Sequence, residues 1–151
     1  MRVLGLRTYR DHLCWASVDG TDRSTATATG HAMVQIPPGE RGASLAWVRE
    51  QVNNLVAQEQ PQVVVVCPAE GSTVSNALTE RAQVDGVVLE ALHVLGIPTK
   101  AKKSATIRYN FGASSTAQLA TALGQVPLIA AIPPSAKRRD PTIAAVSELP
   151  A

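Results

Sequence analysis

The chain opens with Met1-Arg-Val-Leu-Gly-Leu-Arg7-Thr-Tyr-Arg-Asp-His-Leu-Cys-Trp-Ala-Ser-Val18, and this stretch decides its fold. The first half is an apolar run that ends in a polar turn. The second half, from Leu13 to Val18, is rich in residues that favour strands. Two such runs joined by a short polar turn predict an antiparallel β-hairpin.

The composition is that of a folded globular chain. Its 151 residues are 45% hydrophobic and 17% charged, with a net charge of +2. We therefore expect a single domain over residues 1–151 that buries its own core. Cys14 and Cys67 lie in predicted strands, and we expect them to be buried reduced thiols of a cytoplasmic protein. No apolar run approaches the ~20 residues of a membrane span, so we expect no signal peptide and no membrane partner.

The middle of the chain alternates between strand and helix patterns. Thr25–Ile36 predicts a third, half-exposed strand, and the apolar run Gln62–Cys67 predicts a buried central strand parallel to the first. Helical spacing of apolar residues predicts helices over Ala43–Gln58 and over Ser72–Leu95, the second with Ser72 as its N-cap. A glycine inside a helix costs about 1 kcal/mol against alanine. We attribute Gly86 to close packing of the second helix against the sheet.

The last third of the chain continues this alternation. We expect a short basic strand over Thr99–Lys103 and a helix that the capping box Ser115-Thr-Ala-Gln118 opens. The apolar segment Leu128–Ile132 is either a strand or a buried extended connector. Asp140-Pro141 predicts the start of a last short helix, with Asp140 as its N-cap and proline at the first helical position.

The resulting order is three strands, a helix, a strand, a helix, a strand and two helices. Hairpin-connected strands followed by strand–helix alternation predict an α/β fold. We expect a five-stranded mixed sheet, antiparallel over its first three strands and then parallel, with helices on both faces.

The opening strand resembles that of RuvC-type Holliday junction resolvases, which belong to the RNase H-like superfamily. Val3-Leu-Gly-Leu-Arg-Thr-Tyr-Arg10 is similar to the family's Ile-Leu-Gly-Ile-Asp-Pro-Gly-Ser, and Gln83-Val-Asp-Gly-Val-Val88 resembles its Gln-Ala-Arg-Gly-Val-Ala. Thr99–Phe111 falls where the family has a short strand and a basic loop that leads into the next helix. Asp140-Pro-Thr-Ile-Ala-Ala-Val146 is placed like its Asp-Ala-Ala-Asp-Ala-Leu-Ala. The resemblance covers nearly the whole chain and implies an RNase H-like fold.

The resemblance also implies a catalytic site, which this chain alters. Family members use about four carboxylates to hold two Mg²⁺ ions. The first of these acids is Arg7 here, and the second falls at Cys67-Pro68, with Glu70 displaced by two or three residues. Of the two acids on the last helix, the first is Asp140 and the second is Ile143. A permanent cation repels Mg²⁺, so we expect no metal and no cofactor, and we expect Arg7 to pair with Glu70 or Asp140.

Basic residues with interleaved aromatics are typical of a nucleic-acid surface. Two clusters follow this pattern, and we expect both to lie near Arg7 and, together with Arg7, to bind nucleic acid. They are Lys100, Lys102, Lys103 and Arg108 with Tyr109, and then Lys137, Arg138 and Arg139. A solvated basic face would give the same pattern.

The leading hypothesis is a RuvC-like domain that has lost metal-dependent nuclease activity and acts as a nucleic-acid-binding or assembly module. The resemblance implies a homodimer with the long second helix as its interface. The rival hypothesis is a divergent Mg²⁺-dependent endonuclease of resolvase type that uses Asp11, Glu70 and Asp140. A third is a purely structural subunit of a larger complex. Asp85, in the long helix, is expected to be a surface or paired residue.

Overall fold

A single five-stranded sheet organises the computed structural model, which describes residues 1–71 and 75–151. The strands are β1 (Arg2–Thr8), β2 (His12–Asp19), β3 (Thr27–Gln35), β4 (Val63–Cys67) and β5 (Thr99–Ala101). Their order across the sheet is β3-β2-β1-β4-β5. The β1–β2 and β2–β3 pairs are antiparallel, whereas β1–β4 and β4–β5 are parallel. The predicted mixed sheet is therefore confirmed.

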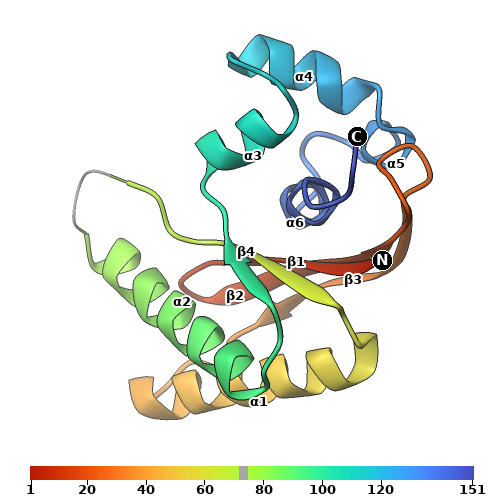
Figure 1. The fold of residues 1–151 in the computed structure, drawn as a ribbon. Coiled ribbons are helices and arrows are strands. Elements are labelled where there is room, and N and C mark those ends of the chain that lie inside the picture. The colour runs from red at the N-terminus through yellow and green to blue at the C-terminus, as the bar shows by residue number, and fades with distance from the viewer. Residues whose placement is uncertain (72–74) are drawn as a thin grey trace.

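Helices cover both faces of this sheet, as predicted (Figure 1). The layer below it in that view holds α1 (Arg41–Glu59) and α2 (Asn76–Val94). The layer above it holds α3 (Ser104–Asn110), α4 (Thr116–Gly124), α5 (Pro127–Ala130) and α6 (Arg139–Val146). None of the helices in the described part of the chain is long and apolar enough to cross a bilayer.

The side chains of β1 point alternately to the two faces of the sheet and contribute to two separate hydrophobic cores. Leu4 and Leu6 are fully buried in the core that the sheet shares with α1 and α2. Val3 is fully buried on the opposite face, in the core that the sheet shares with α6. Because side chains of a strand alternate between faces, Arg7 points toward the α6 layer and Thr8 toward the α2 layer.

Helix α6 rests directly on β1 at Gly5. A Cβ atom at this position would lie 1.8 Å from the carbonyl oxygen of Pro141 and 3.0 Å from the amide nitrogen of Ala145. Only glycine allows the two backbones to approach this closely. The contact holds the first turn of α6, which carries Asp140, above the carboxyl end of β1.

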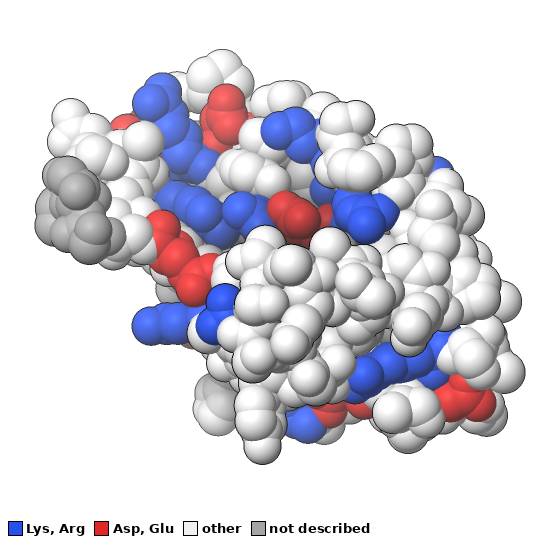
Figure 2. Space-filling view, turned by 90° about the horizontal axis from the view of Figure 1, so that it is seen from above, with Lys and Arg blue, Asp and Glu red and all other residues white. Residues whose placement is uncertain are grey.

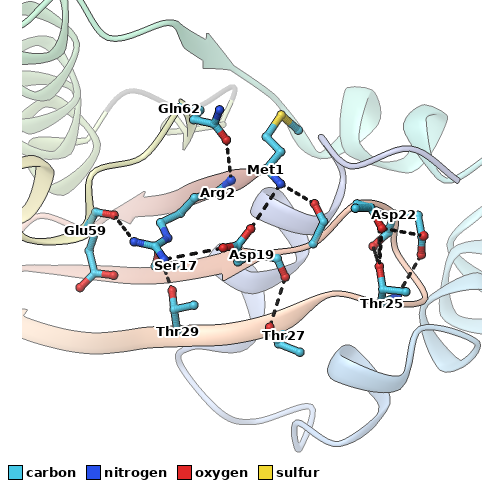
Figure 3. A network of polar contacts seen from close by, with 12 residues as sticks. Met1, Arg2, Ser17, Asp19, Asp22, Thr25, Thr27, Thr29, Glu59 and Gln62 are labelled. Atoms are coloured by element: carbon cyan, nitrogen blue, oxygen red, sulfur yellow. Dashed lines mark hydrogen bonds and ion pairs between the residues drawn. The ribbon is translucent and has the colours of Figure 1, made fainter.

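The amino end of β1 is held by a polar network (Figure 3). Arg2 forms an ion pair with Asp19 at 3.6 Å and donates to the backbone carbonyl of Glu59 at 3.1 Å. Its amide donates to the side chain of Gln62 at 3.0 Å. These contacts link β1 to the end of β2 and to the segment after α1.

Three predictions about helix ends and packing change in the structure. Gly86 does not pack against the sheet, because it is exposed and a Cβ atom there would meet nothing within 4 Å. The predicted N-cap Ser72 lies outside the described residues, and α2 begins at Asn76 with Ser75 as its N-cap. The prediction that Asp140 caps α6 is wrong. The helix begins at Arg139, two residues before the predicted first residue Pro141, so Asp140 lies inside its first turn and its side chain is free to reach Arg7.

Two further segments are more helical than predicted. The basic strand ends at Ala101, and the residues that follow form α3, which the sequence did not predict. The apolar segment Leu128–Ile132 is not a strand, because the short helix α5 covers most of it. The Ser115 cap of α4 is confirmed, since its hydroxyl accepts from the Gln118 amide at 3.2 Å.

We expect Gly5→Ala to destabilise the fold strongly, because the added methyl group would overlap the α6 backbone. The free energy of unfolding should fall by roughly 3 kcal/mol, the upper end of the usual cost of overpacking. Urea denaturation followed by circular dichroism measures it. The control is Gly124→Ala in α4, where a Cβ atom would meet nothing within 4 Å. A Gly5→Ala variant as stable as this control would contradict the contact.

Candidate functional site

A cleft of about 190 Å³ opens where the carboxyl ends of β1 and β4 meet α6. Arg7 enters it from the end of β1, Glu70 from the connection after β4, and Asp140 from the first turn of α6. The remaining residues that line it are Cys67, Pro68, Arg81, Lys102, Ser104, Ile107, Leu119 and Ile143. The cleft lies where the resemblance places the catalytic acids.

Arg7 pairs with Asp140, which was one of its two predicted partners. Its Nη1 atom lies 2.8 Å from Oδ2 of Asp140, and the two side chains are 31% and 49% exposed. A pair this exposed contributes under ~1 kcal/mol to stability, much less than a buried pair. The Nε atom of Arg7 is buried and has no hydrogen-bond partner among the described residues. The pair with Asp140 therefore leaves part of the guanidinium unsatisfied.

Two thiols flank Arg7 in the sheet. Arg7 lies opposite Cys14 in β2 and opposite Cys67 in β4, and both cysteines are free and buried, as predicted. Burial raises the pKa of the Cys14 thiol, and it raises the pKa of the Cys67 thiol to about 11. Both groups are therefore neutral thiols near neutral pH, and neither is an activated nucleophile.

Three cationic side chains lie around the ring of Tyr9, at the edge of the cleft. Its ring centre lies 5.4 Å from the guanidinium carbon of Arg7, 5.5 Å from that of Arg81 and 5.5 Å from Nζ of Lys137. The ring also stacks on His12, with 4.2 Å between the ring centres. Burial raises the pKa of the Tyr9 hydroxyl, and the charge of Arg7 opposes this rise. The hydroxyl is therefore protonated at neutral pH.

Two side chains of α2 hold the floor of the cleft. Asp85 is buried and accepts hydrogen bonds from the Thr8 hydroxyl and from the Ala69 amide, the latter at 2.7 Å. Arg81, one helical turn earlier, donates to the carbonyl of Cys67 at the end of β4 at 3.4 Å and to that of Pro68, the next residue, at 3.2 Å. Asp85 is thus paired, as expected, but it is buried rather than on the surface.

Arg81 was missed by the sequence analysis. It lies four residues before Asp85, so the two share one face of α2. Asp85 follows Val84, which belongs to the apolar face of α2. A carboxylate at the edge of this apolar face could have indicated that it is hydrogen-bonded inside the protein, because buried polar groups need partners.

Glu70 is hydrogen-bonded to the first residue of α3. Its carboxylate accepts from the Ser104 amide at 3.1 Å and from the Ser104 hydroxyl, so it satisfies the first turn of that helix. The hydrogen bond from the Ser104 hydroxyl is the main reason that the pKa of Glu70 lies below its usual value. This exposed residue therefore has a local structural role.

Several of the predicted basic residues make internal contacts. Lys102 is buried and pairs with Glu148 at 2.7 Å, and Lys100 pairs with the same carboxylate. Arg139 donates to the carbonyl of Ile129 at 2.9 Å, at the end of α5. These side chains support the α6 layer, so they have fewer donors left for a ligand.

Other predicted residues face outward. Lys103, Lys137 and Tyr109 are exposed, and Arg108 is partly exposed. Arg138 is partly exposed and contacts His31 on β3 at 3.0 Å. Figure 2 shows basic side chains, with acidic ones between them, crossing the face of the molecule that is seen from above. Lys103 and Lys137 come from the two segments that adjoin the cleft.

The three acids of the rival hypothesis do not meet. Asp11 lies in the turn after β1, where its carboxylate contacts Nδ1 of His12 at 2.6 Å, and it lines a separate hollow beside Tyr9. Of these three acids, only Glu70 and Asp140 line the cleft. The described residues contain no group of three or more His, Cys, Asp or Glu side chains that could hold a metal ion. The residues present therefore do not fit the two-Mg²⁺ site that the resemblance implies.

Solved structures with the same fold were found. RuvC of Thermus thermophilus matches with a TM-score of 0.78 at 17% identity, over 97% of this chain and 92% of that one. RuvC of T. thermophilus in complex with Holliday junction substrate matches with a TM-score of 0.76 at 17% identity, over 97% and 91%. The yeast mitochondrial Holliday junction resolvase Ydc2 matches with a TM-score of 0.71 at 10% identity, over 97% and 76%.

The likeness establishes the fold of this chain as RuvC-like and RNase H-like, as the sequence predicted. No protein-family model and no curated protein matches the chain.

We expect the Glu70 contact to add stability only above acidic pH. A carboxyl group with a lowered pKa in the folded state stabilises the fold above its unfolded pKa of about 4.3, and this stabilisation is lost as the pH falls through the folded pKa. The melting temperature of Glu70→Gln should thus lie below that of wild type at pH 7, and the gap should close at pH 3. The control is Glu50→Gln on α1. A Glu70→Gln gap that is equal at both pH values would refute the contact.

Proposed function

We propose that this chain is a RuvC-like module that binds nucleic acid and does not cleave it with metal ions. The observation that carries this proposal is the Arg7–Asp140 pair at the carboxyl end of β1. A two-metal site requires about four acids, and three of them are replaced here. The replacements are Arg7 at the end of β1, the neutral Cys67 at the end of β4 and Ile143 on α6. Without these acids, the cleft can attract a phosphate but cannot hold the ions that activate water.

The fold and the outward basic residues support nucleic acid as the partner. RuvC of T. thermophilus, which shares this fold, was solved with Holliday junction substrate. In this chain Lys103 lies between the cleft-lining residues Lys102 and Ser104, and Arg108 follows the cleft-lining Ile107. Lys137 lies 5.5 Å from the centre of the Tyr9 ring, and Tyr109 is 81% exposed. Cations that neutralise phosphates and an aromatic ring on which a base stacks are the usual elements of such a surface.

The resolvase likeness also supports the rival, an endonuclease that cleaves with a rearranged acidic site. That rival needs Asp11, Glu70 and Asp140 around one pair of ions. Asp11 contacts His12, Glu70 contacts Ser104 and Asp140 pairs with Arg7, so all three would have to leave their present partners. We therefore place it second.

We expect the protein to bind DNA in EDTA and to leave it intact in Mg²⁺ or Mn²⁺. Four-way junctions, duplexes and single strands should be compared by fluorescence anisotropy and on denaturing gels. On duplex DNA the logarithm of the affinity should fall with the logarithm of salt, with a slope of roughly −0.9 for each phosphate neutralised. Metal-dependent cleavage that Asp140→Ala removes would favour the rival hypothesis. Absence of binding at low salt would favour a purely structural subunit.

Single variants locate the contact surface in the same assay. Lys103→Ala and Arg108→Ala should each weaken binding and reduce the salt slope by about 1. The matched control is Arg49→Ala on α1, an exposed arginine that pairs with Glu90 at 3.0 Å in the helix layer below the sheet. Equal effects of all three variants would mean that net charge, and not this surface, governs binding.

We further propose a homodimer that packs through α2. Gly86 and Ala82 lie one turn apart on the exposed face of this helix, and Val94 at its end is 73% exposed. No described residue requires glycine at position 86, since a Cβ atom there would meet open space among residues 1–71 and 75–151. A facing helix that approaches closely would explain this residue.

Light scattering tests the dimer. Gly86→Arg should convert a dimer into a monomer while the fold is retained, because the long side chain separates the helices. The control is Ala57→Arg, an exposed position on α1. A wild-type protein that is monomeric at all concentrations, or a Gly86→Arg variant that remains dimeric, would contradict the α2 interface.

Two broader expectations complete the proposal. We infer that residues 1–151 act as one domain, since all five strands share one sheet. We infer a cytoplasmic location from the two free thiols, Cys14 and Cys67, because such thiols persist in reducing compartments.

A further inference from the structure

Three cations converge on one aromatic ring at the edge of the cleft. The side chains of Arg7, Arg81 and Lys137 all lie within 5.5 Å of the centre of the Tyr9 ring. They come from β1, α2 and the segment before α6, so only the fold brings them together. Among the described residues, the contact with Asp140 is the one ion pair that these three cations make.

This arrangement carries more positive charge than its surroundings balance. Like charges placed around one ring repel one another, most strongly where water is partly excluded. In addition, the buried Nε atom of Arg7 has no acceptor among the described residues, and an unsatisfied buried donor is costly. An anion with several oxygen atoms at the exposed end of Arg7 would relieve this repulsion, whereas the buried Nε atom lies out of its reach.

We infer that Arg7, Arg81 and Lys137 form a phosphate-binding site, and that the carboxylate of Asp140 occupies it when no ligand is bound. The inference rests on the proposed function, since the ligand is a phosphate of the nucleic-acid backbone. A phosphate offers Arg7 two oxygens in the planar geometry that a guanidinium prefers. The ion pair with Asp140 joins one carboxylate oxygen, Oδ2, to Nη1 of Arg7 at 2.8 Å.

Asp140 is placed to leave the site without a change of fold. Its side chain is 49% exposed, so water can solvate the carboxylate once it turns outward. Exposed pairs of this kind are weak. The backbone of α6 stays in place because it rests on Gly5. Asp140 therefore acts as an internal counter-ion that a phosphate must displace, and it weakens binding by competition.

The test is to remove the charge of Asp140 while keeping its shape. We expect Asp140→Asn to bind inorganic phosphate about fivefold to tenfold more tightly than wild type, because the phosphate no longer competes with a carboxylate. Titration is followed by NMR shifts of the amides near Arg7, and a single-stranded oligonucleotide is titrated in parallel. The double variant Arg7→Gln/Asp140→Asn should lose the gain.

Glu80→Gln is the matched control, because it also removes an exposed carboxylate that pairs with an arginine, Arg10, at 3.4 Å, but outside the cleft. Phosphate affinity of Asp140→Asn that equals wild type, or an equal gain in Glu80→Gln, would overturn the site even if the oligonucleotide binds. A gain for phosphate without any oligonucleotide binding would support the site and refute the proposed function. Asp140→Ser repeats the test should Asp140→Asn fail to fold.

Discussion

The contact between Gly5 and the backbone of α6 is the constraint on which the cleft depends. It brings the first turn of α6 to the end of β1, where Asp140 meets Arg7 at 2.8 Å. The contact involves no charged group, so it does not depend on the charges of the side chains that line the cleft. An RNase H-like scaffold can therefore keep its geometry while the chemistry at the ends of β1 and β4 changes from carboxylates to a guanidinium and a thiol.

The alternation of β1 divides the polar groups of the site between two layers. Arg7 points to the α6 layer and meets Asp140, whereas Thr8 points to the α2 layer and meets the buried Asp85. Arg81 joins the layers, because it donates to the carbonyl of Pro68 after β4 and also lies beside Tyr9. One end of one strand is thus connected to both helix layers, and Arg81 is positioned by hydrogen bonds to backbone carbonyls.

Sequence patterns predicted the parts of this structure that follow local rules. The opening hairpin and the mixed sheet, antiparallel and then parallel, follow from periodicity and element order, and the pairing of Arg7 with an acid follows from the cost of an unpaired cation. Sequence patterns did not predict the features of the structure that depend on contacts between residues distant in the sequence. Nothing local indicates that Lys102 is buried against Glu148, or that Gly86 faces away from the sheet. Helix α3 was missed because its first turn is satisfied by Glu70, more than thirty residues earlier.

The hydrogen bonds that Asp85 and Arg81 make to the exit of β4 have a consequence for the kinetics of binding. They hold the floor of the cleft in place before any ligand arrives. The chain therefore loses little conformational freedom when a ligand binds, and the entropic cost of binding is low. Capture of an anion should be limited by diffusion and by long-range electrostatic attraction, so its association rate should depend on ionic strength far more than its dissociation rate.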